Sequence, residues 1–494
     1  MGKKRDRSKH KSKDESDDES IEEEQKEQQK KRRTEHQASF TNANLVVPDW
    51  SKVKQFQRSY WKGPVGVAEP SEELKLLRKD LGVNVKGNLA SCPPPVLSIE
   101  DANLPSFFRS FFGTHGYMKP TAVQMQAWPA ILNGSNVLGV APTGSGKTLA
   151  YTLPIAHLMS SHLEASSSKS TSLRKPLSLI LLPTRELVSQ VHSVCKALHR
   201  ILPAMSSGMI YGGQNKEEQL ESIVDRGGVN TLIATPGRLI DILQGGSVHN
   251  QYTSALLANT QYVVIDEVDR MLALGFREQL EQILSVVRPD RQGIFFTATF
   301  PHKLREMVDV WAPDYVLIRC QTINIQDTRK SSNIEAINAD ADAKEAKDME
   351  EVDQSSANPG VNSTVSTLSS ITISPHIEQH IHICAAHKRP RLLLKYLEKV
   401  HAQEKDVRQR SGIIIFVNTI KAIKFVQQLL SKQNSEGRSD SKKKDILAVY
   451  RLAILHGQLP QQRREEELNA FRSVSMCCDI MAFSFCLMDF LVLG

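Results

Sequence analysis

Cysteine is scarce in this chain. Its 494 residues include seven cysteines, none with the paired spacing of a metal site. Cys92, Cys195, Cys320 and Cys384 stand singly in the body of the sequence, which predicts reduced thiols in an intracellular protein. Residues 1–7 are mostly charged and no apolar stretch follows them, so a secretory signal is not expected.

Long apolar runs are also lacking. A membrane-spanning helix needs about twenty consecutive apolar residues. Residues 480–493 are largely apolar, but this run is shorter and contains Asp489, so no membrane partner is predicted. Cys477, Cys478 and Cys486, in or near this run, show no metal-binding pattern.

The composition allows two or three domains with real cores, because 40% of the residues are hydrophobic. The net charge is +7 and the pI is about 8.9, which favours a polyanionic partner.

Shifts in composition along the chain predict six segments. They are a disordered charged tail (1–45), an N-terminal extension (46–95), a first α/β domain (96–321), an acidic and polar linker insertion (322–375), a partial second α/β domain (376–473) and a divergent apolar tail (474–494). The first of these has too few apolar side chains to offset the entropy of ordering. Its basic clusters at 3–5 and 30–33 predict a location in the nucleus or nucleolus, or loose RNA binding, although a plain solvated tail explains them as well.

Short apolar runs alternate with helical patterns in both α/β regions. The first region contains Leu177–Leu182, Leu232–Ala234, Tyr262–Ile265 and Gly293–Phe296, and the second contains Ile413–Val417, the helical stretch Lys421–Leu430 and a strand ending at Leu455. A further helix is expected over Glu72–Leu81 in the extension. Strands that are apolar on both faces predict a parallel sheet covered by helices.

A glycine-rich loop is the first candidate site. Its residues are Ala141, Pro142, Thr143, Gly144, Ser145, Gly146, Lys147 and Thr148. Glycines at a helix N-terminus let backbone N–H groups approach phosphate oxygens, with Lys147 placed to reach the β/γ-phosphates and Thr148 to ligate Mg²⁺. The alternative interpretation of such a loop, when it is considered alone, is a tight turn that binds no ligand.

An acidic segment further along the chain argues against a tight turn without a ligand. Asp266 follows the apolar run Tyr262–Ile265, so it is expected at the carboxyl end of a buried strand, where open α/β sheets bind ligands. There Asp266 holds the metal and Glu267 orients the attacking water. Together the two segments predict a nucleoside triphosphatase whose catalytic residues are Lys147, Asp266 and Glu267.

Read in order, the motifs of this chain resemble those of the DEAD-box RNA helicases of superfamily 2. The segments that carry the resemblance are Gly116–Gln124, the loop Ala141–Thr148, Pro183–Leu187, Gly212–Gly213, Thr235–Arg238, Asp266–Asp269 and Thr297–Thr299. The resemblance implies two RecA-like parallel-sheet domains that clamp ATP and Mg²⁺ between them, with RNA lying across both.

The resemblance also implies roles for individual residues. Gln124 is expected to read the adenine edge, and Thr297 and Thr299 to couple the nucleotide state to strand separation. The residues expected to contact RNA are Pro183, Thr184, Arg185, Gly213, Thr235, Pro236, Gly237 and Arg238. Backbone N–H groups, hydroxyls and arginines at such turns bind phosphates and 2′-hydroxyls without reading bases.

Four positions of the first domain depart from the family pattern. Ala141 replaces a glycine, Ile99 replaces an upstream aromatic residue that stacks on adenine, and Val268 replaces the alanine of the family name. Thr297 replaces a serine but keeps the hydroxyl, so its function is expected to survive. If the pocket is tight, the larger Val268 costs about 1 to 3 kcal/mol through overpacking.

The second domain follows the family pattern only in part. Phe416–Thr419, His456–Gly457, Gln461, Arg464 and Phe471 match, but the Arg-Gly-Asp and arginine-rich segments expected after Ser473 are replaced by residues 474–494. The expectation is therefore a truncated second domain that lacks strands and exposes an apolar edge, produced by alternative splicing or a retained intron. Two function classes remain open: an RNA helicase that hydrolyses ATP, and an ATP- and RNA-binding adaptor without turnover. A DNA helicase is a third and more distant alternative.

Overall fold

The structure is a computed structural model of the chain. It describes residues 45, 50, 56–165, 173–245, 249–253, 256–320, 382–403, 412–432, 451–456, 458–473, 479–484 and 491–493. The expected charged tail, apart from Leu45, and the expected linker insertion lie outside the described residues. The backbone divides into two compact units, Met1–Ile377 and Glu378–Gly494, and each is described by itself.

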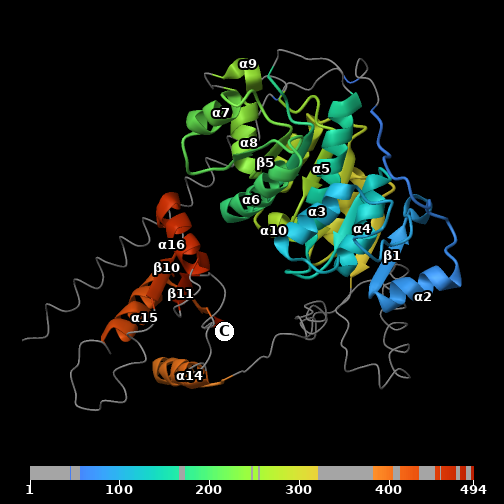
Figure 1. The fold of residues 1–494 in the computed structure, drawn as a ribbon. Helices are drawn as coiled ribbons and strands as arrows, with labels where there is room; N and C mark the ends of the chain where they lie inside the picture. The colour runs from blue at the N-terminus through green and yellow to red at the C-terminus, as the bar shows by residue number, and fades with distance from the viewer. Residues whose placement is uncertain are drawn as a thin grey trace, which may run out of the picture. The chain divides into compact units, whose positions relative to one another are not determined.

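Unit 1 is built on an eight-stranded sheet (Figure 1). The strands are β1 (Val83–Gly87), β2 (Val137–Val140), β3 (Ser178–Leu181), β4 (Ser207–Ile210), β5 (Thr231–Ala234), β6 (Tyr262–Ile265), β7 (Gln292–Thr297) and β8 (Val316–Cys320). Across the sheet they run in the order β1-β8-β2-β7-β6-β3-β5-β4. All neighbours from β8 to β4 are parallel, and β1 is antiparallel to β8.

Helices connect these strands and cover the sheet. They are α2 (Glu72–Asp80), α3 (Ser106–His115), α4 (Ala122–Leu132), α5 (Lys147–Ala165), α6 (Arg185–Ile201), α7 (Lys216–Val224), α8 (Pro236–Leu243), α9 (Asn250–Thr253), α10 (Val268–Ala273), α11 (Arg277–Ser285) and α12 (His302–Trp311). A short 3-10 turn, Leu89–Ser91, follows β1.

Both faces of this sheet are buried. Alternate residues of each strand enter two different apolar clusters: Val137 and Ile294 belong to one, and Leu138 and Phe295 to the other. Helices α3 to α6 supply the first cluster, and α7, α8 and α10 to α12 the second. This two-sided burial explains the continuous apolar runs in the sequence and confirms the predicted parallel α/β sheet.

The segment before residue 96 takes part in this fold. β1 pairs with β8 from Val83↔Cys320 to Gly87↔Val316, and Val83 and Cys92 are buried in the first cluster. The extension therefore supplies the edge strand and part of the core of unit 1.

Unit 2 contains a four-stranded sheet of order β10-β11-β9-β12. Its elements are a 3-10 turn (Ala386–Lys388), α14 (Arg389–Gln403), β9 (Ile413–Val417), α15 (Ile420–Lys432), β10 (Arg451–Leu455), α16 (Gln461–Ser473), β11 (Asp479–Ser484) and β12 (Leu491–Leu493). Leu393 and Leu397 of α14 pack with Ile413 and Ile415 of β9 and with Ile423 of α15.

Residues 474–494 contain the strand β11, which was not expected from the sequence. Those residues were expected to leave the second sheet short of strands, yet β11 lies between β10 and β9 and is parallel to both. Backbone pairing depends on extended geometry and on free N–H and C=O groups, so a segment that departs from a family motif can still occupy an internal strand position.

The body cysteines Cys92, Cys195, Cys320 and Cys384 are free thiols, as predicted. Among the helices that the structure describes, none combines the length and apolar character needed to span a bilayer.

Candidate nucleotide-binding and RNA-binding site

The predicted site segments lie along one side of the unit 1 sheet, where its parallel strands have their carboxyl ends. Six parallel strands carry them at their carboxyl ends: Ala141 follows β2, Pro183 comes soon after β3, Gly212 soon after β4, Thr235 after β5 and Asp266 after β6, while Thr297 ends β7. Parallel strands place their carboxyl ends on the same side, where ligands bind in open α/β sheets. The fold thus brings together residues that lie far apart in the sequence.

The glycine-rich loop Ala141–Thr148, called the phosphate loop below after its predicted ligand, joins β2 to the N-terminus of α5. Its first residue is tied to β7, because the Ala141 N–H donates to the Thr297 carbonyl oxygen at 3.0 Å. Gly144 and Gly146 have φ of 77° and 89°, which other residues rarely adopt. The Ser145 hydroxyl is buried without a hydrogen-bond partner within the part of the chain that is described. An open, positive-φ loop with an unpartnered donor at the start of a long helix fits a phosphate group.

Lys147, the first residue of α5, is buried beneath this loop. Its Nζ donates to the carbonyl oxygens of Ala141 at 2.8 Å and Pro142 at 3.4 Å. Burial lowers the pKa of Lys147, and the nearby carboxylates of Asp266, Glu267 and Asp269 oppose that shift. The ammonium group is therefore close enough to the acidic segment to be stabilised by its negative charge.

Asp266 is buried at the end of β6. Its Oδ2 accepts a hydrogen bond from the Tyr151 hydroxyl at 3.1 Å, and its Oδ1 accepts one from the Glu267 N–H at 2.9 Å. Burial raises the pKa of Asp266 to about 6, although Lys147 and both hydrogen bonds favour the ionised form. The group is thus mostly a carboxylate at neutral pH, with little solvent around it.

Glu267 has a left-handed backbone, with φ 53° and ψ 47°. Such a conformation is unusual for a residue other than glycine, and strain of this kind clusters at functional sites. The Glu267 Oε2 lies 3.1 Å from Nη1 of Arg270, and the side chain remains 22% exposed. The sharp turn places a carboxylate directly after the buried Asp266, before α10 begins.

The ends of β6 and β7 are joined by side-chain hydrogen bonds. The Asp269 Oδ2 accepts from the N–H of Thr299 at 3.0 Å and from its hydroxyl at 2.7 Å. The Thr297 hydroxyl donates to the Thr299 carbonyl oxygen at 2.8 Å. The acidic segment and the Thr297–Thr299 segment are therefore one connected structure.

Gln124 joins α4 to the phosphate loop. Its Oε1 accepts from the Thr121 N–H at 3.1 Å and its Nε2 donates to the Gly146 carbonyl oxygen at 3.0 Å. A side chain at Gly146 would collide with this amide. Ile99 lies partly buried against the core, so it presents an aliphatic rather than an aromatic surface.

The segments predicted to contact RNA follow the neighbouring strands β3, β5 and β4. The Thr184 hydroxyl caps α6 by accepting from the Leu187 N–H at 3.4 Å, and Thr235 and Pro236 begin α8. Arg238 donates from Nη2 to the Gln214 carbonyl oxygen at 2.9 Å. These contacts form a strip along the carboxyl ends of β3, β5 and β4, and β7 and β6 separate this strip from the phosphate loop after β2.

Arg185 and Gly213 are in direct contact in this strip. Gly213 has φ of 87°, and a Cβ built on it would overlap the Arg185 guanidinium. At Gly212 a Cβ would come no closer than 3.7 Å to the same group. The glycine at 213 is thus required for the arginine to lie across the turn.

Two residues of the site were not among the predicted ones. Tyr151 lies one helical turn after Lys147 and hydrogen-bonds Asp266, and Asp269 holds Thr299. Tyr151 could have been predicted from the sequence, because a residue four positions after the loop lysine lies on the same face of the helix. For Asp269 the sequence indicated only that it belongs to the acidic segment already selected.

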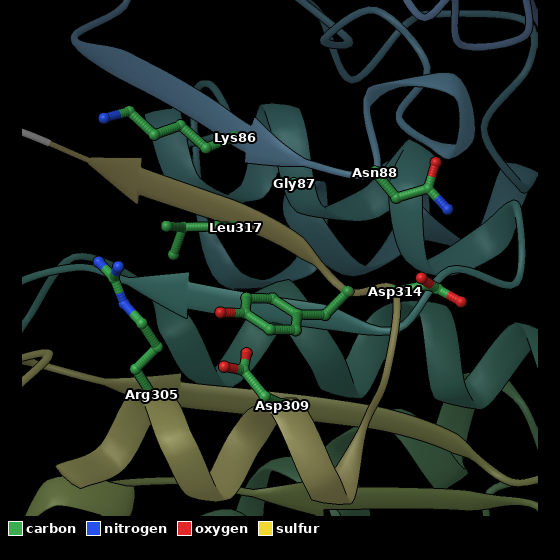
Figure 2. A pocket seen from close by; sticks show the side chains of 8 residues that line it. Lys86, Gly87, Asn88, Arg305, Asp309, Asp314 and Leu317 are labelled. Atoms are coloured by element: carbon green, nitrogen blue, oxygen red, sulfur yellow. The ribbon is translucent and has the colours of Figure 1, made fainter. Parts of the chain in front are cut away.

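A hollow of about 680 Å³ lies elsewhere in unit 1 (Figure 2). Its lining residues are Lys86, Gly87, Asn88, Arg305, Asp309, Asp314, Tyr315 and Leu317. Asp314 and Tyr315 precede β8, so the hollow lies toward the amino ends of the parallel strands, away from the phosphate loop. The predicted site residues do not line it.

The geometry defines an α/β domain in which a glycine-rich loop and an acidic segment follow neighbouring parts of one parallel sheet, and comparisons with known proteins show what this domain is similar to. Residues 121–307 match the family model described as DEAD/DEAH box helicase. This chain contains a DEAD/DEAH box helicase domain, as the sequence resemblance predicted.

Individual relatives agree with this family. The ATP-dependent RNA helicase dbp2 of Schizosaccharomyces pombe is 33% identical over 329 residues, covering 65% of this chain and 56% of that protein. The ATP-dependent RNA helicase DBP2 of Ajellomyces capsulatus is 34% identical over 296 residues, covering 59% and 51%. The chain thus spans about half the length of these relatives. A crystal structure of the yeast DEAD-box splicing factor Prp28 is also similar, with TM-score 0.45 and 23% identity over 88% of this chain and 79% of that one.

Proposed function

We propose that this chain is an ATP-dependent RNA helicase, an ATP hydrolase that locally unwinds or remodels RNA when two lobes close. One observation carries the proposal: the Thr297–Thr299 segment is hydrogen-bonded both to the phosphate loop, through Ala141, and to the acidic segment, through Asp269. The ATP-dependent RNA helicases to which the chain is similar support it.

Each residue of the nucleotide half has a task in this proposal. The loop residues Ala141 to Thr148 receive the phosphates, and Lys147 exchanges its two carbonyl partners for phosphate oxygens. Gln124 reads the adenine edge. Thr148 and Asp266 would hold Mg²⁺, which when bound neutralises charge on the phosphates. Glu267 positions and deprotonates the attacking water.

The RNA half grips a single strand by its backbone. Pro183, Thr184, Arg185, Gly213, Thr235, Pro236, Gly237 and Arg238 are the proposed contacts. Such contacts carry little base preference. Thr297 and Thr299 transmit the nucleotide state, since Thr299 is held by Asp269 close to Glu267.

We further propose the segment 96–321 as the ATP-binding RecA-like domain and 376–473 as part of the second. A location in the nucleus or nucleolus is proposed from the basic clusters at 3–5 and 30–33, which lie outside the described residues.

A second function is an ATP- and RNA-binding adaptor without turnover. It is favoured because the phosphate loop and all the proposed RNA contacts lie in unit 1. Binding can therefore persist where closure of a second lobe does not occur.

Steady-state ATP hydrolysis with and without RNA tests both functions. The full chain is compared with Lys147→Ala and with Lys86→Ala, a matched lysine at the far hollow. Turnover that rises with RNA, survives Lys86→Ala and disappears in Lys147→Ala supports the helicase. ATP binding without turnover supports the adaptor, and folded protein that binds no ATP contradicts both.

A further inference from the structure

A buried arginine connects the N-terminal extension to the helix that carries Gln124. Arg78 of α2 is 6% exposed, and its Nε donates to the Oε1 of Gln126 on α4 at 2.9 Å. Its Nη2 also lies 3.5 Å from the carbonyl oxygens of Cys92 and Pro93. Arg78 thus spans from the extension to α4 through neutral acceptors.

Gln126 completes a clasp around the chain segment at Cys92 and Pro93. It is fully buried, and its Nε2 donates to the Pro93 carbonyl oxygen at 2.8 Å and to the Cys92 Sγ at 3.3 Å. Just beyond, the Val96 N–H donates to the Met125 carbonyl oxygen at 2.9 Å. A buried polar network of this kind fixes one arrangement, whereas apolar contacts alone allow neighbouring elements to slide.

The same helix reaches the nucleotide loop from its other side. Gln124 and Gln126 are two residues apart, so they point in directions about 200° apart around α4. Gln124 hydrogen-bonds Gly146, and the Trp128 Nε1 donates to the Leu149 carbonyl oxygen of α5 at 3.1 Å. Helix α4 is therefore held between the extension and the phosphate loop.

We propose that Arg78 is a positioning residue for adenine recognition: by clasping Gln126 and the Cys92–Pro93 segment, it fixes α4 so that Gln124 meets the adenine edge. This inference rests on the proposed function, since it assumes that Gln124 reads adenine. It makes the N-terminal extension part of the nucleotide pocket. Within the described part of the chain, the hydrogen bonds of Arg78 reach Gln126, Cys92 and Pro93 and no residue of the phosphate loop.

Nucleotide selectivity tests this role better than stability does. Dissociation constants for ATP and GTP are measured for the full chain, for Arg78→Met and for Arg58→Met. Arg58 is a matched control, because it lies in the same extension and also donates to carbonyl oxygens, those of Asp290 and Arg291. Thermal melting confirms that each variant is folded.

The expected result is a loss of preference rather than a loss of binding. Arg78→Met should reduce the preference for ATP over GTP about tenfold, the equivalent of one buried hydrogen-bonding partner lost, with GTP affinity nearly unchanged. Arg58→Met should melt earlier and keep the preference. A folded Arg78→Met protein with the unaltered preference overturns the inference.

Two further outcomes are decisive. If Arg78→Met does not fold, Arg78→Lys, which keeps the charge but not the planar donor fork, takes its place and must show a reduced preference. If the unaltered chain binds ATP and GTP equally, adenine reading by Gln124 is itself wrong. That failure is distinct from the failure of the clasp.

Discussion

The predicted site runs along the carboxyl ends of the unit 1 strands, and its two halves differ in how far their functional groups are buried. In the half formed by β2, β7 and β6, Lys147 and Asp266 are only 8% and 6% exposed, and their opposite charges attract each other. In the half formed by β3, β5 and β4, Gly213 is exposed and Arg185 and Arg238 are partly exposed, although the start of α8 at Pro236 is buried. The same edge of one sheet thus carries buried charges on one side and accessible donors on the other.

This difference matches the two proposed tasks. Charges in a low-dielectric pocket interact strongly and are already oriented when the reaction begins, which suits phosphate chemistry. A polymer backbone must bind and leave repeatedly, and accessible N–H groups and arginines suit that. Variants in one half should therefore leave the function of the other half intact.

The largest effect should come from Glu267→Gln in the buried half. Removing the carboxylate that we propose deprotonates water should lower turnover about 10² to 10³-fold, within the usual range for a general base. ATP affinity and RNA affinity should stay within about twofold, because glutamine keeps the size of the side chain and Lys147 is untouched. Single-turnover hydrolysis and equilibrium binding measure these quantities. Unchanged turnover would remove Glu267 from the mechanism.

In the accessible half, Gly213→Ala should act on RNA alone. The added Cβ overlaps the Arg185 guanidinium, and the left-handed backbone costs about 1 to 2 kcal/mol for alanine. If Arg185 binds an RNA phosphate as proposed, displacing it should weaken RNA binding about tenfold and reduce its salt dependence. ATP affinity should not change.

Gly212→Ala is the matched control for this variant. Its Cβ would meet Arg185 at an ordinary 3.7 Å, so RNA affinity should be nearly unaltered. Equal effects of the two substitutions on RNA binding would contradict the proposed contact between RNA and Arg185.

Proton binding offers a milder test of the buried half. Burial raises the pKa of Asp266 from 3.8 to about 6, so this group's contribution to stability is complete below the unfolded value and is lost as pH rises through about 6. Metal binding needs the carboxylate. From about pH 6 to about pH 7 the ionised fraction rises from half to about nine-tenths, so Mg²⁺-dependent ATP affinity should rise about twofold.

Asp266→Asn should abolish this pH dependence and weaken the contribution of Mg²⁺. Titration of ATP binding with and without Mg²⁺ at each pH measures it. A rise of the same size in the Asp266→Asn protein would assign the titration to another group.

The smallest effect is expected at Val268. Its side chain is fully buried in the second apolar cluster, beneath the acidic pair. Val268→Ala should lower the free energy of unfolding by about 1 to 2 kcal/mol, the value of two buried methyl groups, with turnover unchanged. Chemical denaturation measures this. A gain in stability would instead show that the valine overpacks the site.

Much of the fold could be predicted from local pattern. The runs Tyr262–Ile265 and Ile413–Val417 are strands with those bounds, and the helix expected over Glu72–Leu81 is α2, because apolar periodicity and breakers act over a few residues. The phosphate loop was likewise readable, since glycines, lysine and threonine act within eight positions.

Other features could not be read in this way. β1 pairs with β8 across more than two hundred residues, and neither the pairing nor the entry of the extension into the core has a local signal. The same holds for β11, whose position between β10 and β9 depends on which strands reach it. Pairing partners are chosen by competition among distant segments.

By itself, the sequence determined the chemistry available to this protein: which strands end in a lysine loop, an acidic pair, a threonine segment or an arginine turn. The tertiary structure alone decided how that chemistry is arranged. It placed β7 between β2 and β6, buried Asp266 against Tyr151 and set Arg78 on Gln126, 48 residues away. Residue types and spacing are local properties, whereas strand order, burial and the pKa shifts that burial causes arise only when distant segments pack together.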